Sequence, residues 1–281
     1  ASSLSYNDVR YVIPEDNGDL WVATWGGGLN YFNAKERTFL SFRESEADST
    51  SLSSDNVIAM QKDADKLWLA TFGGGLELFN TSSQKFAHHR YEDTNTNSIS
   101  SNNLFSLLKD SRGNLWIGTS GEGINRLHIA TNQIERFTDE KNIRYATITA
   151  IIEDDSGRIW FSTKQGIFNY DYNADKFTAF PHLAGEFHIN AALKDEKGWL
   201  YFGGINGVLS FNPEEVKPHQ AQPAVKLTNF KLFNKELPIG KNAILPQSIG
   251  FTKEITLAYD DDVITFEFAA LQFPFSNDCE Y

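Results

Sequence analysis

Short apolar stretches alternate with polar turns along this chain, and residues 57–89 show the pattern most clearly. An apolar stretch is followed by a polar turn, a second apolar stretch, a glycine turn and then the alternating Leu76-Glu77-Leu78-Phe79. Alternation with a period of two is typical of a half-buried β-strand. The pattern therefore predicts a unit of four strands, at residues 57–60, 67–71, 76–79 and 85–88. The following copy predicts 104–108, 115–119, 124–127 and 134–137.

The unit recurs five times, and each copy carries a large aromatic residue in its second predicted strand. These aromatic anchors are Trp21, Trp68, Trp116, Trp160 and Tyr201. They follow one another at intervals of 47, 48, 44 and 41 residues. A period in the forties with several strands per copy is typical of β-propeller blades. We therefore predict an all-β fold in which residues 1–216 form five propeller repeats of four antiparallel strands, as part of a larger propeller.

Position in the blade suggests a role for the repeated residues. Each four-stranded sheet has two apolar faces that neighbouring blades must cover, so we expect the five anchors to pack between blades rather than to contact a ligand. The glycine runs 26–28 and 73–75 lead into another strand and not into a helix. A nucleotide-binding loop would open a helix, so these glycines are interpreted as tight turns.

The pattern changes after residue 216. Residues 217–223 contain two prolines and are predicted to form a linker. Strands are predicted at 225–233, 255–259 and 263–270, as at the start of an immunoglobulin-like sandwich. Such a sandwich takes about 100 residues, so we expect residues 224–281 to be an incomplete domain. The chain also begins at a repeat boundary, and we expect it to be a piece of a longer protein.

Composition removes several classes of function. The formal net charge of −12 argues against binding to nucleic acid or to anionic lipid. Cys279 is the only cysteine, which excludes an internal disulfide and a cysteine-based metal cluster. The sequence contains no run of 18 apolar residues of the kind that spans a membrane. No metal or other cofactor is predicted.

Candidate ligand contacts lie where equivalent positions of the repeats differ. The residues that begin the glycine turns share one end of the propeller with the long connectors at 43–56, 92–103 and 139–147, and loops on a rigid scaffold commonly carry function. Aromatic, charged and amide side chains at this end could stack on and hydrogen-bond to a sugar. The candidate ligand-binding residues are Trp25, Phe72, Glu122, Arg144, Gln165 and Asn206. The alternative is an ordinary solvated loop face.

The repeat resembles the two-component regulator propeller repeat, and residues 112–119 (RGNLWIGT) are the closest copy. Residues 259–271 (YDDDVITFEFAAL) resemble the Y_Y_Y domain that follows such propellers. The fourth repeat departs from the pattern because it has Lys164-Gln165-Gly166 in place of three glycines, and the fifth has Tyr201 in place of tryptophan.

The resemblance implies a function. It implies the periplasmic sensor region of a membrane-bound histidine kinase, hybrid kinase or diguanylate cyclase, whose membrane segment would lie outside this chain. Such a region is not catalytic itself, binds an oligosaccharide or another small ligand, and signals as a homodimer through the sandwich domain. The five repeats would then be the last blades of a propeller.

Two other functions stay open. Propellers also host glycosidases and lyases, and Glu122 is a candidate catalytic acid because its equivalents are Gly27, Gly74 and Gln165. No second carboxylate of this kind stands out, so catalytic residues are not assigned. The third possibility is a protein-interaction scaffold, since exposed edge strands can pair with another chain.

Overall fold

The computed structural model describes residues 2–137, 143–164, 166–218, 224–241 and 243–271. The chain divides into two compact units, Ala1–His219 and Gln220–Tyr281. The division falls inside the predicted linker at 217–223. The described residues are almost entirely strands and turns, with two short 3-10 helices at Pro181–Leu183 and Ile249–Phe251.

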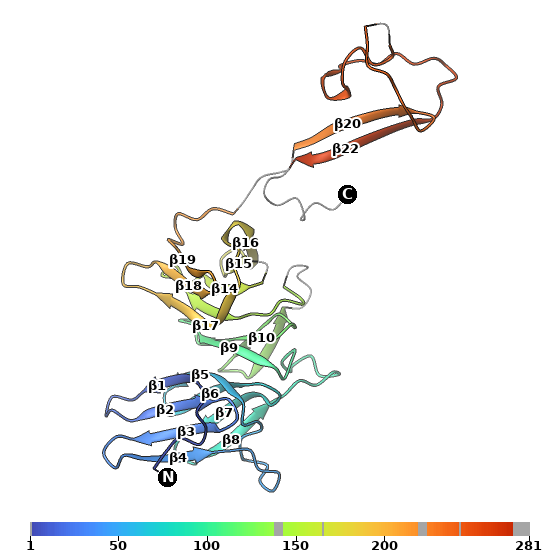
Figure 1. Ribbon diagram of the computed structural model, residues 1–281. Helices are drawn as coiled ribbons and strands as arrows, with labels where there is room; N and C mark the ends of the chain where they lie inside the picture. Colours follow the sequence, from blue (N-terminus) through green and yellow to red (C-terminus); the bar gives the residue numbers. More distant parts are fainter. Residues whose placement is uncertain (1, 138–142, 165, 219–223, 242, 272–281) are drawn as a thin grey trace. The chain divides into compact units, whose positions relative to one another are not determined.

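The first unit contains five antiparallel sheets, which we number blades 1 to 5 in chain order (Figure 1). Blade 1 consists of β1 (Val9–Pro14), β2 (Leu20–Thr24), β3 (Gly28–Asn33) and β4 (Thr38–Phe42). Blade 2 consists of β5 (Val57–Asp63), β6 (Lys66–Thr71), β7 (Gly75–Asn80) and β8 (Lys85–His89). Blade 3 consists of β9 (Leu104–Lys109), β10 (Asn114–Thr119), β11 (Ile124–His128) and β12 (Gln133–Phe137). The eight strands that the sequence predicts for blades 2 and 3 are thereby confirmed.

Blade 4 consists of β13 (Ala150–Glu153), β14 (Ile159–Thr163), β15 (Gly166–Asp171) and β16 (Lys176–Phe180). Among the described residues, blade 5 has three strands, β17 (Phe187–Lys194), β18 (Leu200–Gly204) and β19 (Gly207–Phe211). The prediction of four strands per repeat thus fails in blade 5. After Phe211 the chain enters a turn in which the Asn212 side chain accepts the Glu214 N–H at 3.0 Å. Pro213 lacks an N–H, so it cannot extend a ladder.

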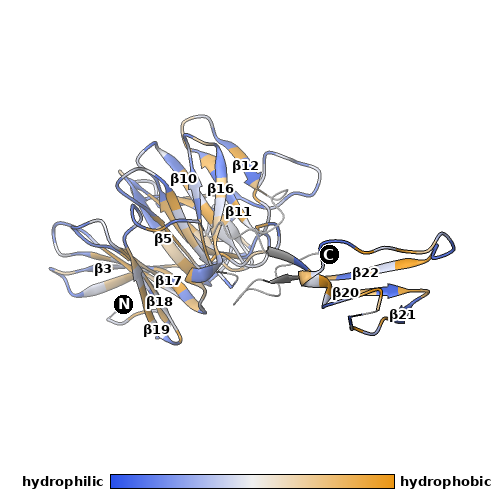
Figure 2. Cartoon of the chain, turned by 90° about the horizontal axis from the view of Figure 1, so that it is seen from above, coloured by the Kyte–Doolittle hydropathy of each residue, from blue (hydrophilic) through white to orange (hydrophobic). Residues whose placement is uncertain are grey.

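Apolar cores fill the junctions between consecutive blades, and Figure 2 shows the hydrophobic residues along the strands. Trp21 packs in the core shared by blades 1 and 2, and Trp68 in the core between blades 2 and 3. Trp116 and Trp160 take the same place at the next two junctions. These four anchors lie between blades as predicted, whereas Tyr201 is only half-buried.

The second unit is a small three-stranded sheet in the order β21-β20-β22. Its strands are β20 (Ala224–Leu232), β21 (Lys235–Glu236) and β22 (Ile264–Leu271). The first and last predicted strands are confirmed, but the strand predicted at 255–259 is wrong. There Ile255 and Leu257 pack onto the small core without pairing in the sheet. Core contact produced an apolar alternation that resembles a strand.

Candidate functional site

The glycine turns and the connectors meet at one end of the blades, which we call the glycine-turn face. The Asp55 carbonyl accepts the N–H groups of Gly26 and Gly28 at 3.0 and 2.8 Å. The Asn102 carbonyl accepts those of Gly73 and Gly75 in the same way, both at 3.0 Å. The amides that could have cradled a phosphate are therefore used to fasten the connectors. The turns are rigid supports for the side chains beside them.

Two predicted residues, Trp25 and Phe72, lie together on this face. Each directly follows the second strand of its blade, and their ring centroids are 5.5 Å apart. Phe105, at the start of β9, also stacks on Phe72, with the ring centroids 6.0 Å apart and the planes tilted by 17°. All three are half-buried. We call these three residues, which lie on blades 1, 2 and 3, the aromatic row.

Arg10 adds a cation to one end of this row. Its guanidinium carbon lies 5.4 Å from the centroid of the Trp25 ring, at a distance suited to a cation–π contact. Arg10 also pairs with Asp8 at 2.8 Å. Flat apolar rings beside charged groups are suited to a ring-shaped polar ligand.

The sequence reasoning missed Arg10 and Phe105. Both lie at a β-bulge of an inner strand, where the register with the second strand shifts by one residue. A bulge turns a side chain away from the direction that simple alternation assigns. The sequence does contain a signal for these two residues. Ile58 occupies the corresponding bulge in blade 2, so an alignment of the starts of the inner strands places Arg10, Ile58 and Phe105 at one equivalent position.

The other predicted residues are not joined to the aromatic row. Glu122 is exposed, and its backbone is held by the Thr119 hydroxyl, which accepts the Glu122 N–H at 2.9 Å. Arg144 is exposed and lies over the ring of its neighbour Tyr145 at 5.2 Å. Asn206 is exposed in the turn between β18 and β19. Gln165 lies outside the described residues.

Neither a metal site nor a membrane-spanning helix is found among the described residues. In the described part of the chain, no group of three or more His, Cys, Asp or Glu side chains could hold a metal ion. No helix among the described residues is long and apolar enough to cross a membrane.

A carboxyl group with a strongly raised pKa lies inside blade 2. Glu77 is fully buried, its carboxylate accepts the Ser53 hydroxyl, and it lies 2.5 Å from Nδ1 of His88. Burial raises the pKa of Glu77 to about 7, and the bonds from Ser53 and His88 offset only part of that rise. Nε2 of His88 lies 2.9 Å from the Ser49 carbonyl. Glu77 and His88 together thus anchor the connector that leads into blade 2.

Blades 1 and 3 have asparagine where blade 2 has Glu77. Asn30 accepts the Ser5 N–H at 3.2 Å, and Asn125 accepts the Ser100 N–H at 3.0 Å. In each of these three blades, a side chain of the third strand is hydrogen-bonded to the preceding connector. Only in blade 2 do two titratable side chains, Glu77 and His88, form this attachment. It supports the glycine-turn face without belonging to the aromatic row.

Comparison with known proteins identifies the repeat. Residues 98–121 and 142–165 match the family described as two component regulator propeller. The histidine kinase P4 of Formosa agariphila is 32% identical over 136 residues. That alignment covers 47% of this chain and 10% of the kinase. The chain thus matches about a tenth of the length of this relative.

Solved structures share the fold. One described as the extracellular domain of a hybrid two-component system of B. thetaiotaomicron matches with a TM-score of 0.61 and 22% identity, over 82% of this chain and 33% of that one. Virginiamycin B lyase of Staphylococcus aureus matches with a TM-score of 0.54 and 13% identity, over 78% and 74% of the two chains. The chain described here is therefore an all-β propeller-type protein that contains two-component regulator propeller repeats at residues 98–121 and 142–165.

Proposed function

We propose that this chain is the ligand-sensing, extracytoplasmic part of a membrane-bound signalling protein and is not catalytic itself. The regulator propeller repeats and the similarity to a histidine kinase support this proposal. The similarity in fold to an extracellular domain of a two-component system is consistent with a periplasmic location. The parent protein would be a histidine kinase or a diguanylate cyclase that dimerises through the domain beginning at residue 224.

The aromatic row is the observation that supports a ligand on the glycine-turn face. Trp25, Phe72 and Phe105 present three half-buried rings side by side, with Arg10 at one end. Successive rings can stack on the apolar faces of successive sugar units, and the connector side chains supply hydrogen bonds. We infer an oligosaccharide or another ligand that contains rings and hydroxyl groups.

A binding screen tests this function. The chain would be titrated with a panel of oligosaccharides by calorimetry, and the Phe72→Ala variant would be compared with the wild type. We expect at least a tenfold loss of affinity, because losing a stacked ring costs about 1.5 kcal/mol. Trp199→Ala is the matched control, since Trp199 is 37% exposed and lies at the other end of its blade. Binding that is unchanged in Phe72→Ala would place the ligand elsewhere.

An enzyme of the glycosidase or lyase class is the second candidate, favoured by the similarity in fold to virginiamycin B lyase. Its test is an assay of oligosaccharide cleavage with Glu122→Gln as the control. Cleavage that depends on Glu122 would contradict the sensor-only proposal. A screen that captured a protein partner and no saccharide would instead favour the interaction scaffold.

A further inference from the structure

Opposite the glycine turns, the grooves between consecutive blades share one design. The tryptophan of one blade faces an apolar residue in the third strand of the next blade. The ring centroids are 5.5 Å apart for Trp21 and Phe79, and 5.2 Å apart for Trp116 and Tyr170. The residue two positions further along the next blade lies at the mouth of the groove. These mouth residues are Thr81, Ile129, Tyr172 and Pro213 for grooves 1/2, 2/3, 3/4 and 4/5.

Two mouth residues pack on the core of their groove, and a third is buried. Ile129 packs on the core that contains Trp68, and Pro213 is buried. Tyr172 packs on the core that contains Trp116. Thr81 is smaller than Ile129 and Tyr172, and groove 1/2 contains an open pocket of about 500 Å³ that Thr81 lines. This volume is within the range of small-molecule sites, about 300–1,000 Å³.

Groove 3/4 shows what such a pocket can hold. The Tyr172 hydroxyl donates to Oδ2 of Asp110 at 2.5 Å and accepts the Trp116 indole N–H at 3.1 Å. The same Asp110 oxygen also accepts that N–H, at 2.9 Å. The Arg112 guanidinium covers the phenol ring at 4.1 Å. Burial and Asp110 raise the pKa of Tyr172 to about 12, so the phenol keeps its proton to donate.

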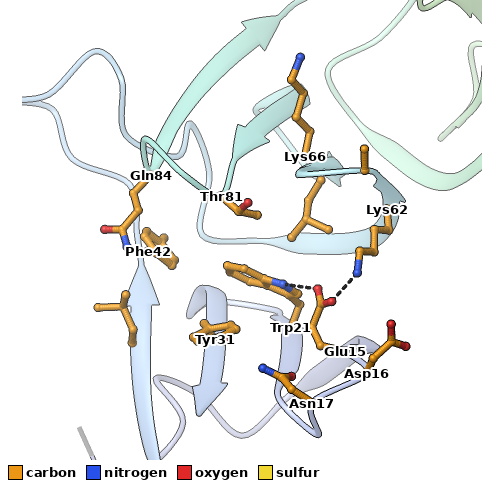
Figure 3. Close-up of a pocket in the computed structure, with 13 residues that line it drawn as sticks. Glu15, Asp16, Asn17, Trp21, Tyr31, Phe42, Lys62, Lys66, Thr81 and Gln84 are labelled. Atoms are coloured by element: carbon orange, nitrogen blue, oxygen red, sulfur yellow. Dashed lines mark hydrogen bonds and ion pairs between the residues drawn. The ribbon is translucent and has the colours of Figure 1, made fainter.

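Groove 1/2 also places a carboxylate beside its tryptophan, but it has no phenol at its mouth (Figure 3). The Trp21 indole N–H donates to Oε1 of Glu15 at 3.0 Å. Glu15 occupies the turn position of Asp110, and Asn17 occupies that of Arg112. Lys62 pairs with the other Glu15 oxygen, so Oε1 is the oxygen that can accept a further donor, as Oδ2 does in Asp110.

We propose that groove 1/2 is a binding site for a small phenolic molecule. Its ring would lie between Trp21 and Asn17, where Tyr172 lies in groove 3/4, and its hydroxyl would donate to Glu15. Tyr31, Phe42 and Leu67 provide the apolar floor of the pocket. The site is separate from the aromatic row, because residues 15–19 precede β2 and Trp25 follows it. The proposal does not depend on the sensor function.

The experiment uses p-cresol as the ligand and toluene as the matched compound without the hydroxyl group. The full chain would be titrated with each while Trp fluorescence and heat are recorded. We expect saturable binding of p-cresol, and binding of toluene that is at least about tenfold weaker, because the hydroxyl bond to a carboxylate is lost. Absence of p-cresol binding, or equal affinity for the two compounds, would overturn the proposal.

Variants at the mouth locate the site. Thr81→Tyr and Thr81→Ile reproduce the filled grooves, and each should weaken p-cresol binding at least tenfold. Thr81→Ser keeps the pocket open and should bind as the wild type does. Circular dichroism would establish which variants fold, and nuclear Overhauser contacts between p-cresol and the Trp21 indole provide a test in the unaltered chain. Unchanged binding in a folded Thr81→Ile variant, or contacts only to other residues, would overturn the proposed site.

Discussion

The junction between blades 1 and 2 and the junction between blades 3 and 4 are built from the same repeat but differ in how they are closed. Both place a tryptophan beside a turn carboxylate, Glu15 in one and Asp110 in the other. Trp116 is fully buried and Tyr172 packs on its core, whereas Trp21 lies beside a pocket that Thr81 lines. The comparison teaches that repeated residues build the sheets, and that the residue at the groove mouth differs between a closed junction and one that holds a pocket.

The largest expected effect concerns the anchors themselves. Trp116→Ala should lower the free energy of unfolding by about 3–5 kcal/mol, the usual cost of removing a buried aromatic side chain. Trp21→Ala should cost about 1 kcal/mol less, because one edge of Trp21 already borders an open pocket and loses fewer contacts. Denaturant unfolding of both variants measures the difference. Equal losses would mean that the open junction is packed as tightly as the closed one.

Exchanging the mouth residues tests the comparison directly. Tyr172→Thr should cost about 1–3 kcal/mol, because it removes a half-buried ring and the hydrogen bonds to Asp110 and Trp116. Thr81→Tyr should change stability by no more than about 1 kcal/mol, since it fills an existing space.

Thermal unfolding with and without p-cresol completes this exchange. If groove 3/4 is the closed form of the proposed site, p-cresol should raise the melting temperature of Tyr172→Thr more than that of the wild type. If p-cresol does not change the melting temperature of Tyr172→Thr, groove 3/4 does not bind the phenol even when it is open, and the two grooves differ in their binding chemistry.

Blades 2 and 3 also differ at one position of the third strand, which is Glu77 in blade 2 and Asn125 in blade 3. Burial raises the folded-state pKa of Glu77 from 4.5 to about 7, so the folded chain holds a proton that the unfolded chain has lost. Stability is therefore greatest below about pH 4.5 with respect to this group, and roughly 1–3 kcal/mol is lost as the pH rises through 7.

Unfolding measured between pH 5 and pH 8 tests this linkage. Glu77→Gln should remove this part of the decline, because the amide has no proton to lose in that range. His88 and Arg90 are the charged neighbours of Glu77 that oppose the shift, so His88→Gln is the matched control and should leave the decline at least as steep. A Glu77→Gln variant with the same pH dependence as the wild type would contradict the buried proton.

Much of the fold could be predicted from the sequence because its signals are local and repeated. A large aromatic residue marks the second strand of each repeat, as Trp116 does in blade 3, and polar turns mark the strand ends. The false strand at 255–259 arose because Ile255 and Leu257 face a core from an unpaired segment, and alternation reports burial rather than pairing. Propensity could not show this, since pairing depends on a distant partner.

The candidate site was less predictable than the fold. Trp25 and Phe72 were found because they differ from the other copies at one turn position, and the structure brings them together. Arg10 and Phe105 were missed because a bulge moves the register within each inner strand. The pocket beside Thr81 requires knowledge of which strand of the next blade faces Trp21, and this is a property of packing between repeats. A ligand-binding role stays a prediction for all six candidates, which are Trp25, Phe72, Glu122, Arg144, Gln165 and Asn206.

The smallest expected effect concerns Trp68, whose indole N–H has no hydrogen-bond partner within the described residues although its side chain is 3% exposed. In blade 2 the turn has only two residues, Ala64 and Asp65, since Asp63 pairs with Lys66 in the ladder. Asp63 therefore binds Lys109 and does not reach the indole.

A phenylalanine at position 68 would remove a buried donor that is already unsatisfied, and this gain offsets the lost volume. Trp68→Phe should thus change the free energy of unfolding by less than about 1 kcal/mol, whereas Trp116→Phe should cost about 2 kcal/mol because it loses bonds to Asp110 and Tyr172. Parallel urea titrations measure both, and equal costs would show that the carboxylate in the turn contributes nothing to closing a junction.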